Sequence, residues 1–214
     1  MKKSLCSLRT AALLVSLLAV NSLMAATVTW SGLGADDNWS TALNWTGGTP
    51  GSANAIVFTD TDATGTSGPT GTPNNIVSAS VAIQSLKYGN SNNFHTTQIS
   101  LGSTLTVTGS VSPIMLVGTA TDNGNTQTVY ATMLGKGLLL VTNNSGIVSI
   151  YQGAATAGGV RRATLDLEGL DTFTAYVSQV SVSGGEGFQR SQATLKLAKT
   201  NSIYCGSPQC LAKQ

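Results

Sequence analysis

Short β-type runs that share one pattern constrain the fold of this chain more than any other feature of its sequence. Ser103–Val107, Ala163–Leu167 and Ala193–Leu197 have a common x-Thr-Leu-x-apolar core, and their starts are 60 and 30 residues apart. Gly137–Thr142 lies close to the missing register. Similar runs at a regular spacing are typical of solenoids, in which each coil stacks on the next. We therefore predict an all-β fold, a parallel β-helix with Leu, Ile and Val inside and Thr, Ser and Asn outside.

The other β-type runs are also short, and Gly, Asn, Asp, Ser and Pro separate them. No amphipathic helix of convincing length appears after residue 26. The predicted strands are Thr27–Trp30, Ala55–Phe58, Ile76–Leu86, Thr97–Thr108, Ile114–Val117, Thr128–Leu134, Leu138–Val141, Gly146–Tyr151, Ala163–Leu167, Thr172–Val182 and Ala193–Leu197. Near Ser178 and Gln179 the alternation breaks, which predicts a bulge or corner. Alternation in short strands also fits a β-sandwich, which is the alternative fold.

The N-terminus has the order of a secretory signal peptide. Lys2 and Lys3 give it a positive start, Ala11–Val20 is almost purely apolar, and small residues follow. The apolar run is too short to span the roughly 30 Å of a bilayer core comfortably. We predict that residues 1–25 are the signal peptide, cleaved after Ala25 or Ala26, and that the protein is secreted or displayed at the cell surface.

Removing the signal peptide changes the charge of the chain. The whole sequence has 11 basic and 9 acidic residues, and the signal peptide holds three of the basic ones. The mature chain therefore has a formal charge of −1, so no electrostatic argument for binding nucleic acid or an anionic membrane survives. We expect no nucleic-acid partner and no membrane span in the mature chain. Charged residues make up only 9% of the chain, which implies a polar but nearly uncharged surface.

The mature chain divides at a polar segment. Residues 59–75 have almost no apolar content, which predicts a long mobile loop or linker. Residues 26–58 contain all three tryptophans, and residues 76–214 contain the β-type repeats. We expect a Trp-rich N-terminal cap segment, the polar loop and then the β-solenoid.

Two patterns carry a resemblance to a known family. The first is Trp30–Gly34, Asp37–Ser40, Asn44–Pro50 and Ala55–Phe58; the second is Ile83–Gly89 with Ile99–Gly109. They resemble the mature N-terminus and recurrent strands of bacterial surface proteins with autotransporter-associated β-strand repeats, some of which carry a C-terminal sorting tag. The resemblance implies a right-handed parallel β-helix on the outside of a Gram-negative-type cell.

The tryptophans allow two interpretations. Exposed faces of Trp39 and Trp45 could stack on sugar rings, as in a carbohydrate-binding module. Alternatively, Trp30, Trp39 and Trp45 cover the open end of the solenoid, which needs a cap over its apolar core and its unpaired strand edge. Their place at the start of the mature chain favours the cap.

The best enzymatic hypothesis uses the acidic residues of one strand. Asp166 and Glu168 are two residues apart, so both carboxylates would leave one face, and Arg161 and Arg162 lie just upstream. Secreted polysaccharide lyases and hydrolases with β-helix folds use such groups. A glycosidase needs two carboxylates across a cleft, which one strand cannot show. We favour an ordinary solvated strand face and predict no catalytic residues.

The remaining polar residues give weaker signals. Cys205 and Cys210 flank a short Gly- and Pro-containing loop and are predicted to form a local disulfide in an exported protein. Asp60, Asp62 and Asp122 could offer oxygen ligands to calcium, but without the spacing of a known loop. His95 is placed in a loop. We expect neither a metal nor another cofactor.

Taken together, these features predict an exported structural or adhesive β-repeat protein of the bacterial cell surface or extracellular matrix. Binding would be passive, through weak hydrogen bonds from a Thr- and Asn-rich strand face to polysaccharide or to other surface proteins. The alternatives are a secreted carbohydrate-binding module and a β-helix polysaccharide lyase or hydrolase.

Overall fold

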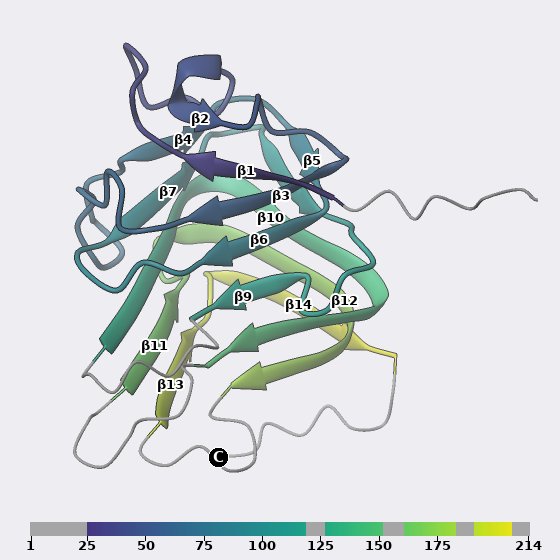
Figure 1. The fold of residues 1–214 in the computed structure, drawn as a ribbon. Coiled ribbons are helices and arrows are strands. Elements are labelled where there is room, and N and C mark those ends of the chain that lie inside the picture. Colours follow the sequence, from purple (N-terminus) through teal and green to yellow (C-terminus); the bar gives the residue numbers. More distant parts are fainter. Residues whose placement is uncertain (1–24, 119–126, 152–160, 183–190, 207–214) are drawn as a thin grey trace, which may run out of the picture.

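Parallel strand pairing organises the whole of the computed structural model, which describes residues 25–118, 127–151, 161–182 and 191–206 (Figure 1). The strands stack as a β-solenoid of about five turns, and the described residues contain one short 3-10 helix, η1 (Ala42–Asn44). Among the named strands only β1 and β2 pair antiparallel. The predicted parallel β-helix is therefore confirmed, and the alternative β-sandwich is wrong.

Three parallel ladders form the sides of the solenoid. The first face comprises β4 (Asn75–Val77), β7 (His95–Ile99), the start of β10 (Gln127–Ile150), β11 (Arg161–Asp166) and β13 (Ser191–Lys196). The second face comprises β5 (Val81–Ile83), β8 (Thr104–Val107), the middle of β10, most of β12 (Leu170–Val182) and β14 (Thr200–Cys205). The third face comprises β1 (Ala26–Trp30), β3 (Asn54–Phe58), β6 (Ser85–Tyr88), β9 (Met115–Val117) and the ends of β10 and β12, with β2 (Trp45–Thr46) on β1.

Inward side chains form rows that run from coil to coil. Leu105, Leu139 and Phe173 occupy paired positions on the second face, and all three are fully buried. Each fully buried side chain of this kind contributes about 1.5–3 kcal/mol relative to an exposed one. The row ends at Asn201, whose side chain accepts from the Ala198 N–H at 3.0 Å and donates to the Ala198 carbonyl at 2.5 Å. A polar residue thus replaces an aliphatic one where the described core ends.

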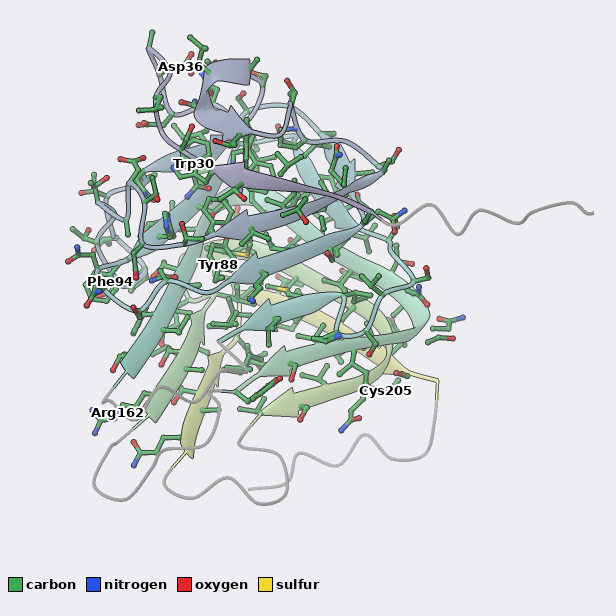
Figure 2. All side chains as sticks on the ribbon, viewed as in Figure 1. Trp30, Asp36, Tyr88, Phe94, Arg162 and Cys205 are labelled. Carbon is green, nitrogen blue, oxygen red and sulfur yellow. The ribbon has the colours of Figure 1, made fainter. Side chains whose placement is uncertain are left out.

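The predicted Trp-rich cap is present at the N-terminal end. Trp30 and Trp45 meet edge to face at 4.9 Å between ring centroids, Trp39 and Trp45 at 5.2 Å, and Phe58 lies 5.9 Å from all three. Trp30 points into the stack of coils (Figure 2). Each indole N–H is satisfied: Trp30 donates to Asp62 Oδ2 at 2.9 Å, while Trp39 and Trp45 donate to buried oxygens. Buried tryptophans need such acceptors, so the cap is a fixed structure.

The polar segment 59–75 differs from the predicted mobile loop. It has little regular structure, but it is fastened to the loop before β7 and to the first face. The amides of Ser91 and Asn92 donate to Asp60 Oδ1 at 2.5 and 2.7 Å. Thr96 Oγ1 donates to the Thr66 carbonyl at 2.6 Å, and the Gly68 N–H donates to Thr132 Oγ1 at 3.3 Å. Apolar content alone did not predict this order, because main-chain and hydroxyl hydrogen bonds hold the segment.

His95 corrects a second expectation. It lies in β7 with no exposed surface, not in a loop, because its ring points inward beside Phe58. In the described part of the chain, no helix is long and apolar enough to cross a membrane. The predicted signal peptide lies almost wholly in residues 1–24, outside the described residues.

Candidate functional site

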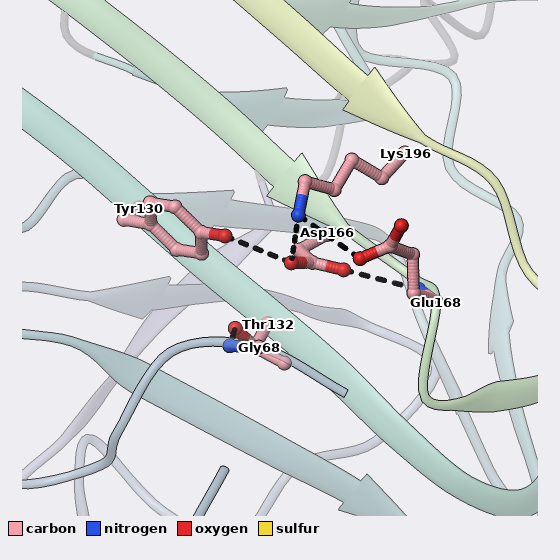
Figure 3. A network of polar contacts seen from close by, with 6 residues as sticks. All are labelled: Gly68, Tyr130, Thr132, Asp166, Glu168 and Lys196. Atoms are coloured by element: carbon pink, nitrogen blue, oxygen red, sulfur yellow. Dashed lines mark hydrogen bonds and ion pairs between the residues drawn. The ribbon is translucent and has the colours of Figure 1, made fainter. Parts of the chain in front are cut away.

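The acidic cluster predicted from the sequence lies on the first face, where three consecutive coils meet (Figure 3). Asp166 pairs in register with Thr132 of β10 on one side and with Lys196 of β13 on the other. It points outward like Thr164, yet it has no exposed surface, because Tyr130 and Lys196 cover it. Glu168 follows in the turn after β11, and 47% of its side chain is exposed.

Both oxygens of the Asp166 carboxylate are satisfied by this chain. Oδ2 accepts from the Tyr130 hydroxyl at 2.8 Å and from Lys196 Nζ at 3.1 Å, and Oδ1 accepts from the Glu168 N–H at 3.1 Å. Lys196 also pairs with Glu168 Oε2 at 2.9 Å. These contacts join β10, β11 and β13, so the cluster ties three coils together.

The protonation of the cluster suits this role. Burial, followed by the hydrogen bond to the Asp166 carboxylate, raises the pKa of Tyr130 to about 12. Hydrogen bonds to Glu168 and then Asp166 raise the pKa of Lys196 above its usual range. Tyr130 therefore stays a neutral donor and Lys196 a cation at any physiological pH.

The described members of the enzymatic set are only partly brought together, because Lys196 joins Asp166 to Glu168 whereas Arg162 stands apart. Arg162 projects from the first face and donates from Nε to Gln192 Oε1 at 2.9 Å (Figure 2). It stands four residues before Asp166 in one strand, which is about 13 Å away at the rise of a β-strand. The Arg161 side chain lies outside the described part. Because Asp166 has no free surface to offer a substrate, the geometry favours a structural role over catalysis.

The second face presents a different surface. Its outward positions form two rows of small or branched side chains, Thr104–Leu138–Thr172–Thr200 and Ala82–Thr106–Leu140–Thr174–Ser202. No Asp, Glu, Lys, Arg or His occurs in β5, β8, β14 or the parts of β10 and β12 that pair over residues 138–143 and 172–177. The two rows are therefore uncharged and carry regularly repeated hydroxyl and methyl groups. The nearest charges border them: Lys136 precedes Leu138 by two residues, and Asp171 and Lys199, directly before Thr172 and Thr200, pair with each other at 2.6 Å.

Two tyrosines border these rows. Tyr176 of β12 and Tyr204 of β14 are paired in register, and their rings stack with centroids 4.8 Å apart and planes 5° apart. They are 42% and 56% exposed, respectively. Exposed stacked tyrosines give this uncharged face an aromatic edge, which the sequence analysis did not single out.

The tryptophans do not offer the sugar-stacking platform that was the alternative to the cap. Trp39 is 3% and Trp45 is 6% exposed, and edge-to-face contacts cover their rings. Trp39 lines a small, mostly apolar hollow of about 150 Å³ together with Pro50, Ser80 and Val81. This burial argues against sugar stacking on either indole.

The buried His95 belongs to a polar network that fastens the cap and the segment 59–75. Its Nε2 lies 2.6 Å from the Thr59 carbonyl, which can only accept, so Nε2 carries the proton and Nδ1 accepts from Asn74 Nδ2 at 3.1 Å. Burial lowers the pKa of His95, although the Thr59 carbonyl and the charges of Asp62 and Asp60 partly oppose this. The imidazole is neutral and has a structural role.

The remaining predicted sites have simple outcomes. Asp60 and Asp62 accept hydrogen bonds from protein donors, and Asp122 lies outside the described residues. Within the described ranges, no group of three or more His, Cys, Asp or Glu residues could hold a metal ion. Cys205 ends β14, while Cys210 lies beyond the described part, so the disulfide stays a prediction.

Comparison of the chain with protein-family models, curated proteins and solved structures found no match. The resemblance to autotransporter-associated repeat proteins therefore stays an expectation.

Proposed function

We propose that this chain is an exported structural or adhesive protein of the bacterial cell surface or extracellular matrix. Its solenoid would serve as a stiff body that holds a binding face, and contact with other surface components would be passive. The observation that carries the proposal is the uncharged second face, where repeated Thr hydroxyls and an exposed tyrosine pair stand on a regular sheet.

Two further features support a passive role. The most acidic cluster of the first face is occupied by hydrogen bonds within the chain, which suits a clamp between coils. The cap, the rows of buried aliphatic side chains and the fastened segment 59–75 also favour a rigid, protease-resistant body. The apolar run of Ala11–Val20 supports export.

Export is the part of this proposal that can be tested first. The full chain is produced in a Gram-negative host, and the cytoplasm, envelope and medium are probed for the protein. We expect a product outside the cytoplasm whose N-terminus, read by mass spectrometry, begins at Ala26 or Thr27. The variant L14R/L17R, which interrupts the apolar run, should remain uncleaved inside the cell. An uncleaved wild-type chain in the cytoplasm would overturn the proposal.

A further inference from the structure

We propose that the second face binds an extended, uncharged polysaccharide chain that runs from coil to coil, across the strands. This inference deepens the proposed function by naming the ligand class and the residues that hold it. Three properties of the face carry it: its lack of charge, its free hydroxyl rows and its aromatic edge.

The lack of charge selects for a neutral ligand. The outward rows of the second face contain only Thr, Leu, Ala and Ser, whereas the first face presents Arg162, Lys196 and Glu168. An acidic polysaccharide would find no cation within these rows to compensate for the loss of its hydration, and Lys199 at their border is already paired with Asp171. A neutral glycan has no charge to desolvate, its hydroxyls can exchange water for the Thr hydroxyls, and its binding should not depend on salt.

The free hydroxyls match the chemistry of a sugar chain. Within the described residues, the hydroxyls of Thr106, Thr172 and Thr174 have no hydrogen-bond partner in the protein. Neighbouring strands lie about 4.8 Å apart, so a ligand that runs across them meets a new set of hydroxyl and methyl groups at each strand. This repeat is close to the length of one ring in an extended polysaccharide. Sugar hydroxyls can donate to and accept from Thr, and their C–H faces can cover Thr methyls and Leu138 or Leu140.

The tyrosine pair supplies the apolar surface that sugar rings require. Tyr176 covers one face of the Tyr204 ring, and β14 pairs with no described strand other than β12. The other face of Tyr204 therefore meets no described strand, consistent with its 56% exposure. An aromatic face with a hydroxyl at its edge can stack on a pyranose and hydrogen-bond to it at once. Tyr204 would bind the sugar at the C-terminal end of the rows.

Co-sedimentation with insoluble polysaccharides tests the inference. The purified chain is mixed with microcrystalline cellulose, with chitin and with calcium polygalacturonate at low and high salt, and the bound fraction gives each dissociation constant. We expect binding to at least one of the two neutral polysaccharides, unchanged by salt. T174K, which places a charge in the centre of the rows, and Y204A, which removes the exposed ring, should each weaken binding about tenfold or more.

The matched control is T194K, the same substitution at an exposed outward position of β13 on the first face. Its binding should equal that of the wild type, and circular dichroism should show all three variants folded. The inference is overturned by binding to neither neutral polysaccharide, by salt-sensitive binding to polygalacturonate alone, or by equal binding of T174K, Y204A and T194K. It is also overturned if sedimentation shows a wild-type dimer that T174K dissociates, which would assign the face to a second copy. Export is measured separately, so either proposal can fail alone.

Discussion

Replacing Asp166 by alanine tests whether the acidic cluster is a clamp between coils. In the wild type, the fully buried carboxylate accepts hydrogen bonds from the Tyr130 hydroxyl and the Glu168 N–H, besides its contact with Lys196. A hydrogen bond to a charged group contributes about 1.5–3 kcal/mol. Two such bonds, at the lower end of that range because water can reach the cavity left by D166A, sum to about 3 kcal/mol. Lys196 keeps Glu168 as a partner in D166A, so its contact with Asp166 contributes nothing further to the expected loss.

Urea unfolding monitored by circular dichroism measures this loss. We expect D166A to lower the free energy of unfolding by about 3 kcal/mol with the slope of the transition unchanged. E168A removes only the exposed ion pair and should have a much smaller effect, since such pairs contribute little. The clamp argument is refuted if D166A loses less than about 1 kcal/mol or if E168A is equally destabilised.

Three other substitutions test the packing of the solenoid and its cap. Burial lowers the pKa of His95, so the unfolded state takes up a proton before the folded state does. This proton uptake does not change the free energy of unfolding above the usual histidine pKa of about 6.5, and it lowers that free energy increasingly as the pH falls below it. The free energies of unfolding of wild type and H95Q, measured with urea from pH 7.5 to 5, should therefore diverge by at most about 1.4 kcal/mol per pH unit. The wild type should lose more stability than H95Q as the pH falls, and an equal loss in both would contradict this. W45A removes a buried indole from the cap and should lower the free energy of unfolding by about 3–5 kcal/mol in the same assay. G135A places a methyl group at a φ of 108° against the Ile99 carbonyl oxygen. It should destabilise the fold by about 2 kcal/mol or more, seen as a lower thermal midpoint. An unchanged midpoint would show that the turn can relax.

Most of the strands could be predicted from the sequence, because alternation and turn residues mark them locally. The predicted strand boundaries were wrong where one coil turns a corner. The single predicted run Ile76–Leu86 is three strands, β4, β5 and β6, on three different faces. The predicted break near Ser178 coincides with a register shift between β10 and β12. β14 was missed because Asn201 interrupts its inward apolar pattern.

The repeat pattern predicted the solenoid, but it grouped together similar runs that lie on two different faces. The spacing of 30 residues is structural, since Ala163–Asp166 pairs residue by residue with Ala193–Lys196 on the first face. The run Ser103–Val107 belongs to the second face, where Leu105 pairs with Leu139 of the segment Gly137–Thr142. The spacing of 60 residues is therefore a coincidence, because the runs that start at Ser103 and Ala163 lie on different faces.

Part of the candidate site could have been predicted from the same repeat. Aligning the two runs that start at Ala163 and Ala193 places Lys196 opposite Asp166, as the structure does. The contribution of Tyr130 could not be predicted, because it comes from the preceding coil at a different spacing and from a diagonal position. The uncharged second face was also hidden, because its rows appear only once the pairing of four strands is known.

The central claim is that a rigid solenoid carries its binding function on the uncharged second face, and mapping by nuclear magnetic resonance tests it most directly. Amide signals of the isotope-labelled mature chain are followed while a soluble hexamer of the neutral polysaccharide that binds, cellohexaose or chitohexaose, is added. The account predicts shifts confined to β8, the middle of β10, β12 and β14, largest near Thr174 and Tyr204. Shifts centred on Asp166 and Glu168, or on the hollow beside Trp39, would contradict it and place the function elsewhere on the molecule.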